Sequence, residues 1–306
     1  MQKVLAIVGP TAVGKTSLAI ELARQLKAEI ISGDSMQVYR EVAIGTAKAT
    51  PAEQQVVKHY LVDTQSVFEP YAVTDFVRQA REAIAEIANK GKLPLLVGGT
   101  GFYVNALLNQ LQLGEKEEQL TAVEPKWQSL LDQAGPQKLW QELNKRDAKT
   151  AAHLPAANSR RVLRALTVID RTGKKFSEQQ KEIKPRYDYL IIGLNAERQE
   201  IYNRINLRVD QMMEQGLVKE ANFVYQNRDR EQQILQAIGY KEFFPYFTGE
   251  KTLAACVADL KTASRRYAKR QLTYLRHQLP VTWVDPLNDP AYLTKITEKV
   301  EEWINE

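Results

Sequence analysis

The chain has 306 residues, a mass of 34.8 kDa and a formal net charge of +5, and at about 150 residues per domain this length suggests two domains. Hydrophobic residues make up 44% and charged residues 26%, a balance that excludes an intrinsically disordered chain. The single cysteine, Cys256, excludes an intramolecular disulfide and a multi-cysteine metal site. The three histidines lie far apart in the sequence, which argues against a zinc centre.

No apolar run approaches the ~18 residues that a membrane-spanning helix needs. The apolar run nearest the N-terminus, Val4–Val8, is too short for the core of a secretory signal peptide. We therefore expect a cytoplasmic protein without membrane association, and a monomer is the expected state.

The first hundred residues alternate between short apolar runs and stretches with helical spacing. Such alternation predicts a parallel sheet whose strands are buried under helices on both faces. Ligands of these sheets bind beyond the carboxyl ends of the strands. The predicted strands are Val4–Val8, Glu29–Ser32 and Leu93–Val97, and the predicted helices are Thr16–Leu26, Asp75–Ala88 and Phe102–Leu108.

The pattern then changes to charged helices without a strand candidate, before strands return near residue 189. We predict an α/β core of residues 1–112 and 185–306, interrupted by an all-helical insertion of residues 113–184. The predicted helices of the insertion include Lys126–Gln133, Pro136–Leu143 and Ser159–Arg171. The remaining elements are strands at Tyr189–Leu194 and Val281–Val284, with long helices at Glu197–Asn227 and Leu253–Leu279.

A phosphate-binding loop lies between the first predicted strand and helix. Its sequence, Gly9-Pro10-Thr11-Ala12-Val13-Gly14-Lys15-Thr16, fits the pattern G-x-x-x-x-G-K-[ST] in the strand–helix context that the motif requires. Glycines allow successive amides to face one anion, and the helix N-terminus adds partial positive charge. Lys15 supplies a mobile cation, and the Thr16 hydroxyl can bind Mg²⁺. The loop predicts a pyrophosphate ligand without saying which compound carries it.

The acidic metal ligand of an ordinary NTPase is missing from the expected strand end. Leu93–Val97 runs into Gly98-Gly99-Thr100-Gly101, and Asp63 is a weak substitute. Asp34, just past the second strand, is placed to act as a general base or near a metal, or alternatively as an N-cap. Thr100 is open to the same two interpretations, as an N-cap or as a hydroxyl of the site.

Basic residues are concentrated in two segments. Residues 261–276 contain six basic and no acidic side chains, and residues 160–175 contain six basic and one acidic. Either cluster could be an ordinary solvated helix face. Beside a phosphate-binding motif, the two together favour a polyanionic partner.

Six motifs in order make the chain resemble the bacterial tRNA dimethylallyltransferases, from Val4 to about Asp285. They are Gly9–Thr16, Asp34-Ser35-Met36-Gln37-Val38-Tyr39-Arg40, Ile44-Gly45-Thr46-Ala47-Lys48, Gly98-Gly99-Thr100-Gly101-Phe102-Tyr103-Val104, Ala237-Ile238-Gly239-Tyr240-Lys241-Glu242 and Arg265-Arg266-Tyr267-Ala268-Lys269-Arg270-Gln271-Leu272-Thr273. The resemblance implies a P-loop NTPase-like fold. It also implies transfer of a dimethylallyl group from dimethylallyl diphosphate to tRNA, at the N6 amine of the adenosine 3′ of the anticodon, in tRNAs that read codons beginning with U.

The resemblance also implies roles for individual residues. Residues Gly9 to Thr16 would hold the diphosphate with Mg²⁺, and Arg208 would lie near it. Asp34 would take the proton of the acceptor amine, which Thr100 would orient. The remaining tRNA contacts implied are Ser35, Met36, Gln37, Asn158, Ser159, Arg160, Arg161 and Arg164, together with Asp34 and Thr100. Whether the phosphate loop also binds ATP does not follow from the motif.

Two alternatives remain at this point. A small-molecule kinase of the P-loop type would explain the loop, Mg²⁺ and a helical lid, but neither basic segment. A GTPase-like RNA-binding switch would need an Asn-Lys-x-Asp motif that reads guanine. Asn89-Lys90 lacks the aspartate, and Asn144-Lys145-Arg146-Asp147 fits the pattern but lies within the predicted helical insertion, away from the strand ends of the α/β core. The chain also has Lys58-His59-Tyr60-Leu61 where the family often has Pro-His-His-Leu.

Overall fold

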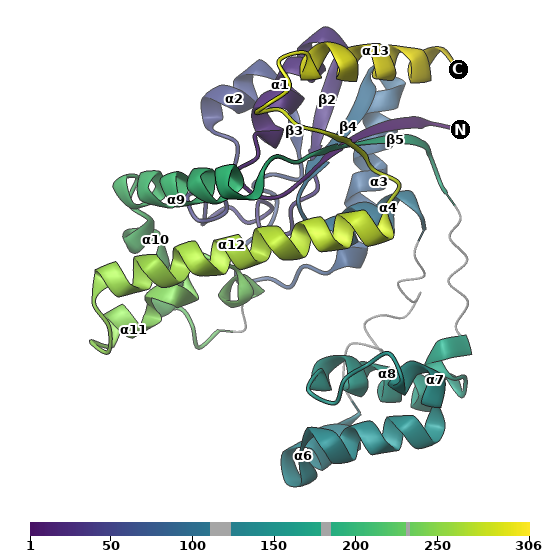
Figure 1. Cartoon of the computed structure of the whole chain (residues 1–306), viewed down its shortest axis with the longest axis vertical. Helices are drawn as coiled ribbons and strands as arrows, with labels where there is room; N and C mark the ends of the chain where they lie inside the picture. The colour runs from purple at the N-terminus through teal and green to yellow at the C-terminus, as the bar shows by residue number, and fades with distance from the viewer. Residues whose placement is uncertain (111–123, 179–184, 231–232) are drawn as a thin grey trace. The chain divides into compact units, whose positions relative to one another are not determined.

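A computed structural model describes residues 1–110, 124–178, 185–230 and 233–306 (Figure 1). The chain forms two compact units, Met1–Gln110 with Pro185–Glu306, and Leu111–Lys184. The predicted domain boundaries, at 112/113 and 184/185, fall within or next to residues outside the described ranges.

The described part of the larger unit contains a six-stranded sheet in which every pairing is parallel. The strand order is β3-β2-β4-β1-β5-β6. This is the α/β, P-loop-like core that the sequence predicts. The strands are β1 (Lys3–Val8), β2 (Ala28–Ser32), β3 (His59–Tyr60), β4 (Leu93–Gly98), β5 (Asp188–Leu194) and β6 (Thr282–Val284).

Helices cover both faces of this sheet, as continuous apolar strands require. Apolar side chains of α1 and α13 pack with inward residues of β1, β2, β4 and β5 in one cluster, while α3 and α4 pack on the opposite face. α9 lies beside α12 (Figure 1). The helices are α1 (Lys15–Gln25), α2 (Pro51–Val56), α3 (Val73–Asn89), α4 (Gly101–Leu108), α9 (Arg198–Glu214), α10 (Leu217–Gln226), α11 (Phe244–Phe247), α12 (Leu253–Gln278) and α13 (Tyr292–Asn305), with 3₁₀ turns η2 (Gln233–Gln236) and η3 (Lys241–Phe243).

The structure corrects one predicted helix and contains elements that the sequence analysis did not predict. The segment Glu197–Asn227 is two helices, α9 and α10, because Gly216 adopts the left-handed conformation with φ of 100° between them. In the larger unit the sequence analysis missed α2, β3, α11 and α13. α13 buries Ile296, Val300 and Trp303 against the sheet, and this helical spacing was available in the sequence.

The described residues of the smaller unit, 124–178, contain helices and no strand. They are α6 (Pro125–Arg146), α7 (Ala148–Ala151), α8 (Ser159–Thr172) and the 3₁₀ turn η1 (Phe176–Glu178). α6 is broken at Gly135, whose φ of 78° and ψ of 175° are not helical, so the two shorter helices predicted there are confirmed. Their apolar sides pack on α8 around Leu139, Leu143 and Val162.

None of the helices in the described ranges combines the length and the apolar character needed to cross a membrane.

Candidate functional site

Three sequence motifs meet at one edge of the sheet. Strands β2, β4 and β1 are neighbours and parallel, so their carboxyl ends lie side by side. The segments that follow them carry Asp34, Thr100 and the phosphate loop, respectively. The sheet therefore brings together segments as distant in the sequence as Gly9 and Thr100, at the edge where ligands of such sheets bind.

Backbone crowding shapes this edge. The Gly33 N–H donates to the Val97 carbonyl at 2.7 Å, and a Cβ on Gly98 would lie 2.4 Å from the Gly33 carbonyl oxygen. A Cβ on Gly99 would lie 2.2 Å from Nε2 of Gln271. Only glycine fits at these two positions without movement of backbone or of a buried side chain.

Gln271, on α12, links the phosphate loop to the turn after β4. Its Oε1 accepts from the Thr11 N–H at 2.9 Å, and its Nε2 donates to the Gly99 carbonyl at 3.0 Å. The side chain is buried, and both its polar atoms are satisfied, as burial of an amide requires. Gln271 thus fixes the separation between the two loops.

The phosphate loop runs from the end of β1 into α1, as the motif predicts. Gly14 takes the left-handed conformation with φ of 105° at the N-terminus of α1. The Lys15 ammonium donates to the Pro10 carbonyl at 2.7 Å, which folds its side chain back over the loop. Thr16 is half-buried in the first turn of the helix.

Two arginines of α9 face this loop. The Arg204 Nε donates to the Ala12 carbonyl at 2.8 Å, and the Arg208 guanidinium reaches the Thr11 hydroxyl at 3.4 Å. Within the described ranges, Arg208 forms no ion pair with a carboxylate, so it is not a surface salt bridge. The structure places Arg208 beside the loop, as the family resemblance implies. It also places Arg204 there, which the sequence analysis did not name.

Burial lowers the pKa of Lys15 to about 7, and the nearby positive charge of Arg208 lowers it further, whereas Asp34 acts in the opposite direction. In the ligand-free protein the Lys15 ammonium group therefore loses its proton as the pH rises through about 7. A bound anion would favour the charged form.

Asp34 lies two residues beyond β2 and is half-buried. Burial raises the pKa of its carboxyl, while the Met36 N–H and Lys15 oppose the increase. The Met36 N–H donates to Oδ1 at 2.9 Å, so Asp34 does cap the following turn. The Gln37 N–H also contacts the Asp34 carboxyl and, like the Met36 N–H, favours its charged form.

The Thr100 hydroxyl does not cap α4 and instead contacts the turn that follows Asp34. Thr100 precedes α4 without a capping hydrogen bond, and its Oγ1 instead accepts from the Ser35 N–H at 3.3 Å. The Tyr267 side chain lies against it: burial and the Asp34 charge raise the pKa of Tyr267 to about 12, while contacts with Thr100 and Gln271 lower it. Asp34, Thr100 and Tyr267 are thus close together.

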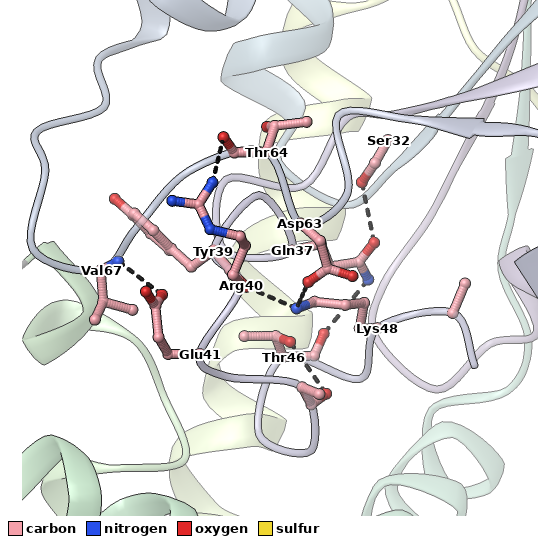
Figure 2. A network of polar contacts seen from close by, with 12 residues as sticks. Ser32, Gln37, Tyr39, Arg40, Glu41, Thr46, Lys48, Asp63, Thr64 and Val67 are labelled. Carbon is pink, nitrogen blue, oxygen red and sulfur yellow. Dashed lines mark hydrogen bonds and ion pairs between the residues drawn. The ribbon is translucent and has the colours of Figure 1, made fainter. Parts of the chain in front are cut away.

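The segment after Asp34 is held by a polar network that sequence analysis did not foresee (Figure 2). Gln37 accepts from the Ser32 hydroxyl at 3.0 Å and donates to the Thr46 and Ala47 carbonyls at 3.4 and 3.2 Å. The Lys48 ammonium is buried and binds both Asp63 and the Tyr39 carbonyl. Asp63 is therefore engaged by Lys48 and is not placed as a metal ligand.

The predicted RNA-contacting arginines lie on α8 of the smaller unit. Val162, Leu163, Ala165 and Leu166 are buried on one side of this helix, whereas Arg160, Arg161 and Arg164 are exposed on the other. Asn158 and Ser159 begin the helix and are half-buried. These five residues lie at the N-cap and within the first two turns of α8.

Comparison with known proteins identifies the family. The model for the IPP transferases matches residues 37–278. A tRNA dimethylallyltransferase from Lactobacillus helveticus is 68% identical over the full length of both chains. The chain belongs to the IPP transferase family. This membership favours the main interpretation of the sequence over the kinase alternative.

Solved structures of IPP transferases share the fold. The full-length tRNA isopentenylpyrophosphate transferase from Bacillus halodurans is 42% identical, with a TM-score of 0.75, and the match covers 100% of this chain and 97% of that one. A eukaryotic dimethylallyltransferase acting on tRNA is 29% identical, with a TM-score of 0.84 over 100% of this chain and 80% of that chain.

Sequence reasoning assigned no role to Gln271, Tyr267, Arg204 or Lys48. Gln271, Tyr267 and Lys48 lie inside motifs that carry the family resemblance, which was the available signal. Arg204 lies outside all six motifs. Its contact with the loop arises because α9 packs along the phosphate loop.

The pKa of Lys15 predicts how anion binding depends on pH. Below pH 7 the side chain is charged, and above pH 7 the free protein loses this charge, so the affinity for inorganic pyrophosphate should fall by up to about tenfold per pH unit between pH 7 and 9. The Lys15→Arg variant, which stays charged, should lack this component. Calorimetric titrations of both proteins would measure it, and parallel pH profiles would contradict it.

Proposed function

We propose that this IPP transferase moves a dimethylallyl group from dimethylallyl diphosphate to the N6 amine of the adenosine 3′ of the tRNA anticodon. The observation that carries the proposal is the meeting of a cationic phosphate loop with Asp34 and Thr100 at one sheet edge. An anion site beside a base suits group transfer from a diphosphate to an amine.

The chemistry follows from these positions. A bond forms between N6 and C1 of the dimethylallyl group, while the C1–O bond breaks and its electron pair leaves with the diphosphate. Lys15, Arg208 and the loop amides stabilise the charge that develops on this leaving group. Asp34 accepts the proton released from N6, which its raised pKa favours. Thr100 orients the amine.

The residues present fit a Mg²⁺ ion that is held mainly by the substrate. Within the described ranges no group of three or more His, Cys, Asp or Glu side chains could hold a metal. Mg²⁺ commonly binds through one or two protein oxygens together with substrate phosphates. Thr16 would provide such an oxygen, and the ion would neutralise the leaving diphosphate.

The acceptor base must leave its stack in the anticodon loop to react, and unpaired loop bases are accessible to such extrusion. Asp34 to Gln37 and Thr100 would contact the extruded nucleotide and its neighbours. Asn158, Ser159, Arg160, Arg161 and Arg164 would bind the RNA backbone through the smaller unit.

A direct assay tests the reaction. Purified protein, labelled dimethylallyl diphosphate, Mg²⁺ and an unmodified anticodon stem-loop should give labelled RNA without ATP, because the donor already carries its leaving group. A stem-loop with inosine in place of the acceptor adenosine lacks the N6 amine and should remain unlabelled. A strict requirement for ATP, or equal labelling of the inosine control, would reject the proposal.

Replacing Asp34 separates chemistry from donor binding. Asp34→Asn should lower the single-turnover rate by about 10²–10⁴-fold, the usual contribution of a general base, while pyrophosphate affinity changes only a few-fold. Asp229→Asn, at an exposed position, is the matched control. A rate for Asp34→Asn within a few-fold of the original protein would exclude Asp34 as the base.

The salt dependence of RNA binding tests the α8 surface. If Arg160 and Arg161 each neutralise a phosphate, replacing both by alanine should make the log–log slope of affinity against salt shallower by about 1.4 to 1.8, at about 0.7–0.9 per contact. Fluorescence titrations of the stem-loop at several salt concentrations would measure the slope. The double variant Lys138→Ala/Lys149→Ala removes two other exposed charges of this unit and should change the slope less.

A further inference from the structure

We propose that Glu220 is a positioning residue for Asp34, acting through the backbone of the loop Ala43–Gly45. Glu220 lies on α10, outside every motif named above. The proposal rests on the proposed function, because its effect is expressed in the rate of transfer to RNA. Four hydrogen-bond donors surround the Glu220 carboxylate.

Three consecutive backbone amides converge on Glu220. The Ala43 and Ile44 N–H groups donate to Oε2 at 2.7 and 3.0 Å, and the Gly45 N–H donates to Oε1 at 2.8 Å. Consecutive amides that face one point form an anion-binding nest. Here the anion belongs to a helix of the same unit, so the carboxylate holds the loop in one conformation.

A buried tyrosine holds the other side of this carboxylate. The Tyr240 hydroxyl donates to Oε1 of Glu220 at 2.9 Å, and its ring is fully buried. A Cβ on Gly45 would lie 2.7 Å from that ring, so the loop lies flat on Tyr240. Burial and the Glu220 charge raise the pKa of Tyr240, which keeps the hydroxyl protonated as a donor.

A continuous hydrogen-bonded path leads from this loop to Asp34. The Thr46 and Ala47 carbonyls, next to the anchored amides, accept from Nε2 of Gln37. Oε1 of Gln37 accepts from the Ser32 hydroxyl, whose oxygen accepts from the Asp34 N–H at 3.4 Å. Figure 2 shows the central part of this path, from Ser32 through Gln37 to Thr46.

Neighbouring contacts keep the path from relaxing. Lys48, at the end of the loop, binds Asp63 and the Tyr39 carbonyl, and the Asp63 N–H donates to the Gln37 carbonyl at 3.3 Å. The loop is therefore fixed at both ends. Glu220 of α10 holds the amides of Ala43–Gly45, and Lys48 holds the other end. Loss of its charge would free the loop to shift the Gln37 side chain and with it the turn that carries Asp34.

The Glu220→Gln variant tests this proposal. It keeps the size of the side chain but removes the charge, and its Nε2 cannot accept from an amide. We expect the single-turnover rate of transfer to the stem-loop to fall by about tenfold to a hundredfold, as small misplacements of reacting groups cause. Pyrophosphate affinity should change less than a few-fold, because the phosphate loop makes no contact with Ala43–Gly45 in the described hydrogen bonds.

Coupling to Gln37 distinguishes positioning from general stability. In the Gln37→Ala background the path is already cut, so Glu220→Gln should then lower the rate less than threefold further. A structural role would lower the rate by the same factor in both backgrounds. Rates are measured well below the thermal midpoint of each variant.

Controls complete the experiment. Glu214→Gln, at an exposed position near the end of α9, should transfer at the original rate. Tyr240→Phe removes one of the four contacts to Glu220 and should give a smaller loss, which keeps the test open if Glu220→Gln does not fold. A wild-type rate for Glu220→Gln, or equal losses with and without Gln37, would overturn the proposal. Failure of the unmodified protein to label RNA would instead reject the proposed function.

Discussion

Close packing of the backbone at the carboxyl edge of the sheet is the constraint on which the site depends. β2 and β4 approach so closely that a Cβ on Gly98 would overlap the Gly33 carbonyl. This approach brings the turn of Asp34 against the turn of Thr100, where the Ser35 N–H meets the Thr100 hydroxyl. Gln271 then ties the second turn to the phosphate loop. The three loops are thus joined by direct backbone approach between the first two and by the buried Gln271 side chain between the last two.

Electrostatics follow from this packing. Lys15 and Arg208 are held near one another and partly out of water, which lowers the pKa of the lysine. Asp34, at the same edge of the sheet, has its pKa raised by burial. Each group is held in an environment that its charge disfavours, and a bound dianion or an incoming amine would relieve that cost. The site therefore favours a negatively charged ligand next to Lys15 and Arg208 and a proton donor next to Asp34.

Much of the fold was readable from the sequence because local rules dominate it. Apolar runs such as Val4–Val8 and the helical spacing of α8 are local patterns, and both elements form as predicted. The phosphate loop is equally local, since its glycines and its lysine act within eight residues. The helix predicted over Glu197–Asn227 failed at Gly216, because helical spacing on both sides of a glycine does not reveal which way the chain turns.

The sequence by itself therefore determined five strands of the described sheet, the anion loop and the residues that carry the family resemblance. Tertiary structure alone decided which distant groups meet: Gln271 with Thr11 and Gly99, and Glu220 with the amides of Ala43–Gly45. These contacts join segments more than 170 residues apart. The local sequence around Glu220 or Gln271 does not indicate a structural role for the side chain. That role depends on the backbone carbonyls and amides that folding brings next to it.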